Sequence, residues 1–143
     1  MPTRLKISEE TSKRLEYLSK RLGLRRNIVC RLAIGRSLAE NESVKTVDPK
    51  DSNGYEFNRY TLTGEYDSIF KALIIQHEKK WVHDAEYFTK YLRNHIERGV
   101  NLLYYEYERI NSPVEFLVTL SMCIQRSESE PQYEQGRLGI EEG

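Results

Sequence analysis

Apolar residues change their spacing several times along the chain, and each spacing predicts a different element. Residues 4–8 alternate apolar and polar side chains, which is typical of a short strand with one buried face. Two helical segments follow, the first beginning after Ser8 and ending at Gly23, the second beginning after residues 25–27. The second segment is apolar around more than half of its circumference, so it needs burial on several sides and indicates an oligomer.

The remainder of the chain joins polar connections to further helical patterns. Residues 40–54 are polar and contain turn signals, so they predict a connecting loop. Residues 55–62 regain β character, with apolar and polar side chains mixed at short spacing. Three helices are expected after that: one from about Thr63 to Trp81, one following Asp84, and one opening at the capping box of residues 112–115.

These elements predict a mainly α fold in a single domain, residues 1–143. A strand–helix–helix head occupies residues 1–39, and a three-helix body occupies residues 55–125. The acidic tail of residues 126–143 is rich in Ser, Glu, Gln and Gly and is expected to be disordered.

The composition indicates a cytoplasmic protein. No apolar run approaches the ~18 residues that a membrane span needs, and no signal peptide is expected. The two cysteines, Cys30 and Cys123, both lie in apolar helical stripes and are expected to be buried, unreactive thiols.

Charge is distributed very unevenly, although the whole chain is neutral. Residues 1–36 carry ten Lys/Arg and three Glu, a net charge of +7, and the rest of the chain carries −7. A basic head of this kind is typical of a nucleic-acid-binding protein, and the alternative is a solvated helix surface. The residues expected to contact DNA are Arg4, Lys6, Lys13, Arg14, Lys20, Arg21, Arg25, Arg26 and Asn27.

The order of strand, helix, glycine turn and helix over residues 3–39 resembles the ribbon–helix–helix family of DNA-binding dimers. In that family two chains pair their strands into an antiparallel ribbon that enters a major groove, and the second helix binds a phosphate at its N-terminus. By position, the resemblance implies that Arg4, Lys6 and Ser8 face the groove and that residues 25–27 meet the DNA backbone. A strand pair that only dimerises is the alternative.

The segment from Glu56 to Asp67, EFNRYTLTGEYD, is the most specific string in the chain. Together with the apolar SIFKALI that follows it and the later HIERGVNLL, it strongly resembles the DndE family of DNA phosphorothioation. That modification replaces a non-bridging phosphate oxygen with sulfur. The resemblance runs from about Arg4 to about Arg109, and the helix opening at Pro113 lies beyond it.

The resemblance to DndE implies a non-catalytic accessory protein that binds nicked double-stranded DNA, forms a homotetramer and uses no cofactor. It also implies partner proteins of the same system: a cysteine desulfurase, an ATP pyrophosphatase-like protein and a DNA-dependent ATPase. A ribbon–helix–helix transcriptional regulator or antitoxin is the alternative function, and it leaves the helical body unexplained. A small DNA-processing enzyme is a third hypothesis.

The residues that could carry chemistry form no recognised pattern. The three histidines match no dependable zinc spacing, so no metal site is expected. The carboxylates of Glu56, Glu65 and Asp67 resemble the carboxylate cluster of a nuclease active site only superficially. We expect Glu56 to pair with Arg59, and Glu65 and Asp67 to serve the first turn of the third helix. No catalytic residue is therefore predicted.

Overall fold

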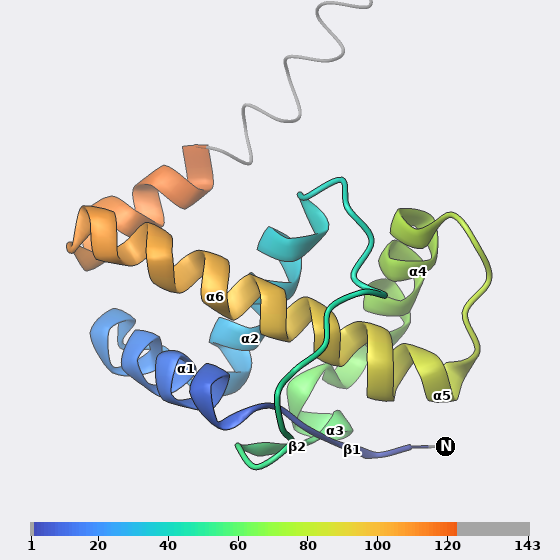
Figure 1. The fold of residues 1–143 in the computed structure, drawn as a ribbon. Helices are drawn as coiled ribbons and strands as arrows, with labels where there is room; N and C mark the ends of the chain where they lie inside the picture. The colour runs from blue at the N-terminus through green and yellow to red at the C-terminus, as the bar shows by residue number, and fades with distance from the viewer. Residues whose placement is uncertain (1, 123–143) are drawn as a thin grey trace, which may run out of the picture. The chain divides into compact units, whose positions relative to one another are not determined.

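The computed structural model describes residues 2–122 of the chain, and they are mainly helical, as the sequence predicts (Figure 1). Two compact units divide the chain, Met1–Tyr105 and Glu106–Gly143. No helix among the described residues has both the length and the apolar character that a membrane span requires. The elements are β1 (Arg4–Lys6), α1 (Glu9–Leu22), α2 (Arg26–Leu38), β2 (Glu56–Asn58), α3 (Arg59–Leu62), the 3-10 turn η1 (Gly64–Tyr66), α4 (Asp67–Glu78), α5 (Asp84–Glu86), the π-helical segment η2 (Tyr87–Leu92) and α6 (Arg93–Ile110).

The strand–helix–helix head forms where the sequence predicts it. The Ser8 hydroxyl accepts a hydrogen bond from the Thr11 N–H at 3.3 Å and caps α1. Gly23 ends α1 in the left-handed conformation, with φ 68°, which glycine adopts without steric cost. α2 begins at Arg26, slightly earlier than expected.

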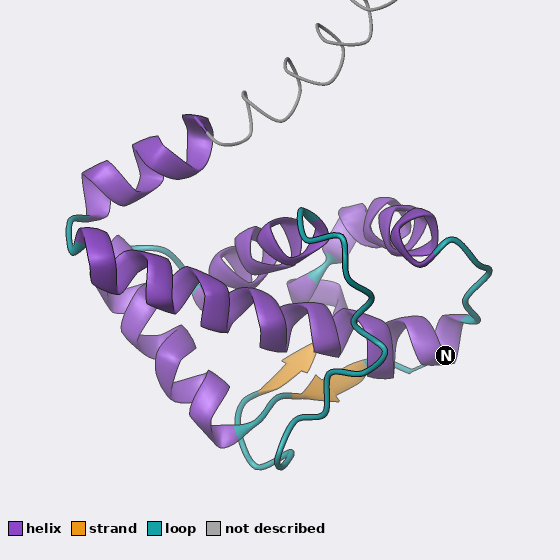
Figure 2. Ribbon diagram, turned by 45° about the horizontal axis from the view of Figure 1, so that its top comes forward, coloured by secondary structure: helices purple, strands orange, loops and turns teal. Residues whose placement is uncertain are grey.

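β1 pairs with β2 of the same chain, which corrects the expectation that two chains would pair their first strands. The pairing of the two strands is antiparallel (Figure 2). Leu5 stands opposite Phe57, and both side chains are buried. The Arg59 N–H donates to the Thr3 carbonyl at 2.7 Å and extends the ladder beyond the strands. The ribbon is therefore built within one protomer.

Only part of residues 55–62 is extended, contrary to the prediction. β2 ends at Asn58, whose side-chain oxygen accepts a hydrogen bond from the Tyr60 N–H at 2.8 Å and caps α3. A side chain that bonds the backbone two residues ahead competes with strand pairing. The capped turn therefore replaces the second half of the expected strand.

The two long helices of the body differ in extent from the prediction. α4 begins at Asp67, after η1, and ends at Glu78, where Lys79 takes a left-handed conformation with φ 60°. The expected fourth helix is a continuous helical run from Asp84 to Ile110 that includes the π-helical η2. The helix expected from about Thr63 to Trp81 is thus α4, and it is shorter at both ends than its apolar pattern indicated.

α2 and α6 pack backbone to backbone in the core. A Cβ atom on Gly99 would lie 1.9 Å from the Ala33 carbonyl oxygen, so only glycine fits there. Cys30 is fully buried and desolvation raises its pKa, as expected of an unreactive thiol, whereas Cys123 lies outside the described residues. The fully buried apolar side chains of the first unit include Leu15, Leu18, Ile34, Leu62, Ile74, Leu92, Ile96 and Val100.

In the second unit, residues 113–122 are helical. The Glu115 N–H donates to the Ser112 hydroxyl at 3.4 Å, as the capping box predicts. The rings of Tyr107 and Phe116 pack edge to face with centroids 5.5 Å apart. The tail predicted to be disordered, residues 126–143, lies outside the described residues.

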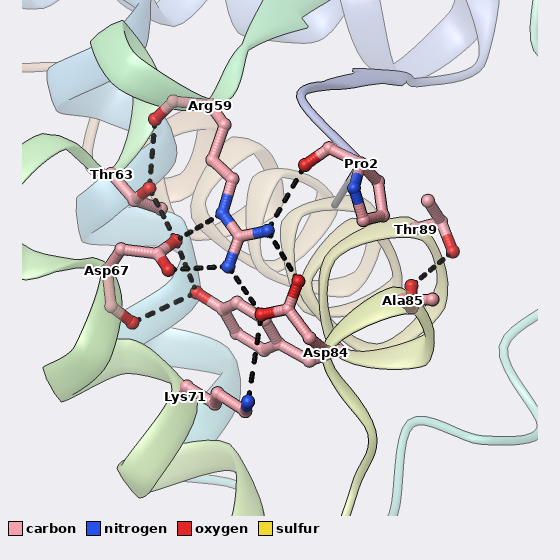
Figure 3. Close-up of polar contacts among 9 residues, drawn as sticks. Pro2, Arg59, Thr63, Asp67, Lys71, Asp84, Ala85 and Thr89 are labelled. Carbon is pink, nitrogen blue, oxygen red and sulfur yellow. Dashed lines mark hydrogen bonds and ion pairs between the residues drawn. The ribbon is translucent and has the colours of Figure 1, made fainter.

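Arg59 joins four segments of the first unit through a buried guanidinium group (Figure 3). Its Nε and Nη2 donate to the two carboxylate oxygens of Asp67 at 3.1 and 2.6 Å. Its Nη1 and Nη2 donate to the two oxygens of Asp84 at 3.0 and 2.8 Å, and Nη1 also donates to the Pro2 carbonyl at 3.1 Å. One side chain thereby ties the segment before β1 to α3, α4 and α5.

Hydrogen bonds keep both aspartates charged. Burial would raise the pKa of Asp67, but hydrogen bonds from Arg59, Thr63 and Tyr87 more than offset it, so the pKa lies below its ordinary value of 3.8. The hydrogen bonds from Arg59 lower the pKa of Asp84 as well. The network is therefore an ionic one at neutral pH.

Replacing Arg59 with Met should lower the free energy of unfolding by about 3 kcal/mol, because it leaves two carboxylates without their cation in a partly buried site. Urea unfolding followed by circular dichroism measures the change. Lys71→Met is the matched control, since Lys71 lies 3.6 Å from Asp84 at the edge of the network. The control should cost less than about 1 kcal/mol; equal losses in the two variants would contradict the central role of Arg59.

The same network predicts a pH dependence. Because Asp67 and Asp84 have lowered pKa values when folded, the unfolded chain binds more protons as the pH falls through and below 3.8. The stabilisation is therefore fully present above that pH and is lost below it. The Arg59→Met variant should lose less stability than the wild type over this acidic range.

Candidate nucleic-acid interface

The outer face of the ribbon carries both signs of charge. Arg4 and Lys6 are exposed while Leu5 between them is buried, as the alternating pattern predicts. The Arg4 guanidinium lies 3.4 Å from the carboxylate of Glu56, which stands opposite Lys6 in the pairing register. Glu56 therefore reduces the attraction that this face offers to a phosphate.

Ser8 does not belong to this outer face, which corrects its predicted place toward a groove. It is buried, and its N–H and hydroxyl donate to the Glu97 carboxylate at 2.6 and 3.0 Å. The Thr11 hydroxyl donates to the same carboxylate. The start of α1 is thus bound to an internal anion from α6 and is closed to an external one.

Three of the four cations of α1 are each accompanied by an acid one turn earlier. The Lys13, Arg14 and Lys20 side chains lie 3.6, 2.9 and 3.4 Å from glutamates at i−4. Such exposed pairs are weak, but they lower the net charge along the helix. Arg14 is also turned toward the protein, with its guanidinium 4.8 and 5.0 Å from the rings of Tyr104 and Tyr105.

The start of α2 has a different environment. Arg25 occupies the N-cap position and is exposed, no side chain caps this helix, and its first turn holds no acidic residue. The Arg26 guanidinium lies 4.2 Å from the centroid of the Tyr55 ring, which holds it in place. Among the described residues, neither arginine forms an ion pair within 4.0 Å. Asn27 donates to the Thr61 carbonyl at 3.1 Å.

Four exposed cations lie at the end of α1 and the start of α2, the two helix ends that the Gly23 turn joins. We call this surface the basic corner, and its residues are Lys20, Arg21, Arg25 and Arg26. Of the other predicted contact residues, Arg4 and Lys6 lie on the ribbon face, Lys13 and Arg14 lie along α1, and Asn27 lies in the first turn of α2.

Two residues beside the basic corner were not predicted. Arg31 donates from Nε to the Leu62 carbonyl at 2.9 Å, and its guanidinium lies 5.4 Å from the Tyr66 ring centroid. Tyr60, on α3, exposes 84% of its surface. The sequence predicted β character for residues 55–62, so the exposure of Tyr60 on a helix could be found only once α3 was known.

Two of the three carboxylates weighed as a nuclease group, Glu56 and Asp67, pair with different arginines. Asp67 is bound by Arg59, as described above, and Glu56 pairs with Arg4. The predicted pair of Glu56 with Arg59 is therefore wrong. The acids that pair with Arg59 lie on the two helices that follow, which the local sequence did not indicate.

Two of the three histidines come together, although they lie on different helices. His77 of α4 and His95 of α6 have ring centroids 5.3 Å apart. Burial, with smaller contributions from Arg98 and His77, lowers the pKa of His95 to about 3. His83, by contrast, is exposed.

The chain is similar to proteins of DNA sulphur modification. The family described as DNA sulphur modification protein DndE matches residues 4–110, which include both the head and most of the body. A crystal structure of DndE from Escherichia coli B7A, described as involved in DNA phosphorothioation modification, is 24% identical with a TM-score of 0.58 and covers 70% of this chain and 96% of that chain.

A crystal structure of a DndE mutant involved in DNA phosphorothioation is 23% identical with a TM-score of 0.55, covering 72% of this chain and 97% of that chain. At these identities the two structures show a shared fold. Comparison with curated protein sequences gives no match. The family match extends over most of the chain, and the chain therefore belongs to the DndE family of DNA sulphur modification proteins.

Proposed function

We propose that this protein is a non-catalytic, DNA-binding accessory protein of DNA phosphorothioation. Its membership of the DndE family supports the role in sulphur modification. The observation that carries the binding role is the basic corner, where two cations at the end of α1 are followed by two at the start of α2. A surface of this kind attracts the phosphates of any duplex, because the contact releases condensed counterions.

The start of α2 is suited to a phosphate for a second reason. The first N–H groups of a helix have no partner within the helix, and the macrodipole places a partial positive charge there. At α1 this end is occupied by Ser8 and Glu97. At α2 no side chain caps it. A phosphate bound here would also lie within reach of Arg25 and Arg26.

The preferred ligand in this proposal is a nicked duplex. A nick loosens base stacking on one strand, so an exposed aromatic ring can contact a base that intact DNA keeps covered. Tyr60 offers such a ring beside the Thr61 carbonyl that Asn27 binds. The protein would act in the cytoplasm with a cysteine desulfurase, an ATP pyrophosphatase-like protein and a DNA-dependent ATPase, which supply the sulfur-transfer chemistry.

A second copy of the chain is the proposed partner for the outer face of α4. Tyr66, Ile69 and Leu73 lie on one stripe there and expose 45%, 54% and 41% of their surfaces. Exposed apolar side chains grouped in this way are typical of interaction sites. On α2, Ile28 and Leu32 are half-buried within the protomer, so that helix offers less apolar surface to a partner than expected. We propose a homotetramer assembled through the α4 stripe.

The wild-type protein should bind nicked duplex more tightly than intact duplex or single strands, and the logarithm of its affinity should fall steeply with the logarithm of salt concentration. Fluorescence anisotropy with labelled oligonucleotides measures both quantities. Equal affinity for the three ligands at physiological salt would contradict nick recognition and leave only general electrostatic attraction.

Changing Arg25 and Arg26 to Ala should weaken binding to every duplex alike and reduce the salt slope by about two, because up to two phosphate contacts are removed. The matched control removes two cations from the end of α4. Lys80 is changed to Ala there, and Lys79 to Gly because of its positive φ of 60°. If the control loses binding and the arginine variant retains it, the DNA surface lies on the helical body.

Replacing Ile69 with Glu should reduce the molar mass measured by multi-angle light scattering, because the change places a charge in the proposed interface while leaving the protomer core intact. Ser68→Glu is the control, since Ser68 is exposed on a different side of α4. A wild-type monomer at micromolar concentration would contradict the proposed assembly.

A further inference from the structure

Two histidines and a glutamate converge between α4 and α6. His77 and Glu78 are the last residues of α4, and His95 lies near the start of α6. One nitrogen from each histidine and one carboxylate oxygen of Glu78 all lie within 4.8 Å of one another. In the described part of the chain, no other group of three or more such residues comes this close.

Hydrogen bonding shows which atom of His77 is free to bind a cation. Its Nε2 lies 2.5 Å from the Glu40 carbonyl oxygen, which only accepts, so Nε2 carries the proton. Nδ1 of the neutral ring then has a lone pair. It is buried without a hydrogen-bond partner among the described residues, 3.5 Å from the Glu78 carboxylate. Two acceptors at this distance need a positive ion or a proton between them.

His95 completes the group. Its Nδ1 lies 2.8 Å from the Ser37 hydroxyl, and its Nε2 is buried with no hydrogen-bond partner in the described residues. A proton on Nδ1 of His77 would satisfy the pair with Glu78 but would leave Nε2 of His95 unpaired. A metal ion would be bound by all three side chains at once.

We propose that Nδ1 of His77, Nε2 of His95 and a carboxylate oxygen of Glu78 bind a divalent transition-metal ion of the zinc class, which joins α4 to α6. Two imidazoles and a carboxylate are a ligand set that zinc favours. Ligands about 2.1 Å from a tetrahedral zinc ion lie about 3.4 Å apart, so side-chain movements of about an ångström would close the site.

The outer hydrogen bonds of the group suit a metal site when the Ser37 hydroxyl accepts from Nδ1 of His95 as well as from Nε of Arg98, which lies 2.8 Å from it. Each histidine uses its remaining ring nitrogen on the backbone carbonyl of Glu40 or the hydroxyl of Ser37, as described above. Glu78 accepts from the Ser43 hydroxyl at 2.5 Å and from the Val44 N–H at 3.3 Å. Partners of this kind orient metal ligands and fix the tautomer of a ligating histidine.

A cavity adjoins one member of the group. It has a volume of about 200 Å³ and is lined by Leu38, Leu73, Gln76 and His77. The site is independent of the basic corner, so it does not rest on the proposed DNA binding.

The test uses untagged, full-length protein treated with a chelator and then titrated with Co²⁺ as a spectroscopic probe. We expect one equivalent of Co²⁺ to produce the visible absorption of a four- or five-coordinate ion, and Zn²⁺ to displace it. Isothermal titration calorimetry with Zn²⁺ gives the affinity. His77→Gln, His95→Gln and Glu78→Gln should each weaken that affinity by at least about 100-fold.

His83→Gln is the matched control, because His83 is the remaining histidine and is exposed. It should bind the metal as the wild type does. Wild-type protein that gives no Co²⁺ absorption and no Zn²⁺ heat would overturn the proposal, and this result does not depend on whether any variant folds. Metal binding that is lost in His83→Gln but kept in the other variants would overturn it as well.

Discussion

Two aspartates share one buried arginine in this protein, and the meeting of α3, α4 and α5 with the segment before β1 depends on that group. Asp67 begins α4, Asp84 begins α5, and Arg59 follows β2 directly. A buried guanidinium or carboxylate without a partner is costly, so the three groups are satisfied only when these elements meet. The bond from Arg59 to the Pro2 carbonyl brings the segment before β1 to the same place. Apolar packing alone would allow these elements to be arranged in more than one way. The ionic group therefore favours the arrangement in which its three charged side chains meet.

The head uses its two helix starts in opposite ways. The start of α1 is filled by residues of the protein itself, with Glu97 supplying a buried negative charge. The start of α2 has no side-chain cap and no acid in its first turn, and Arg26 there packs on the Tyr55 ring, although Lys20 at the end of α1 pairs with Glu16. The short Gly23 turn joins α1 to α2, so both helix starts belong to the same small head. What differs between the two starts is the set of residues that surrounds each of them. This contrast distinguishes the start of α2 from the start of α1 as the place where we propose that a phosphate binds.

Local features of the fold could be predicted from the sequence, and features made by distant residues could not. The Ser8 cap, the Gly23 stop and the Ser112 capping box each depend on neighbours within a few positions, and all three are confirmed. The partner of β1, the acids that pair with Arg59 and the meeting of His77 with His95 depend on how helices pack. Alternation in residues 4–8 predicts a strand but does not say which strand it pairs with. The basic corner was predicted from charge, whereas the inward turn of Arg14 needed the position of Tyr104.

The position of β1 also bears on the order in which the protein folds. β1 can pair only after β2 exists, and Ser8 reaches the Glu97 carboxylate across a sequence separation of 89 positions. Contacts between such distant residues require a long loop to close before they give any stabilisation. On a ribosome, where synthesis proceeds from the N-terminus, α1 and α2 emerge well before the residues that complete the cap and the ribbon. The basic head is thus synthesised first, but its contacts with the rest of the chain form last. Its apolar faces can be buried only after α6 has been synthesised.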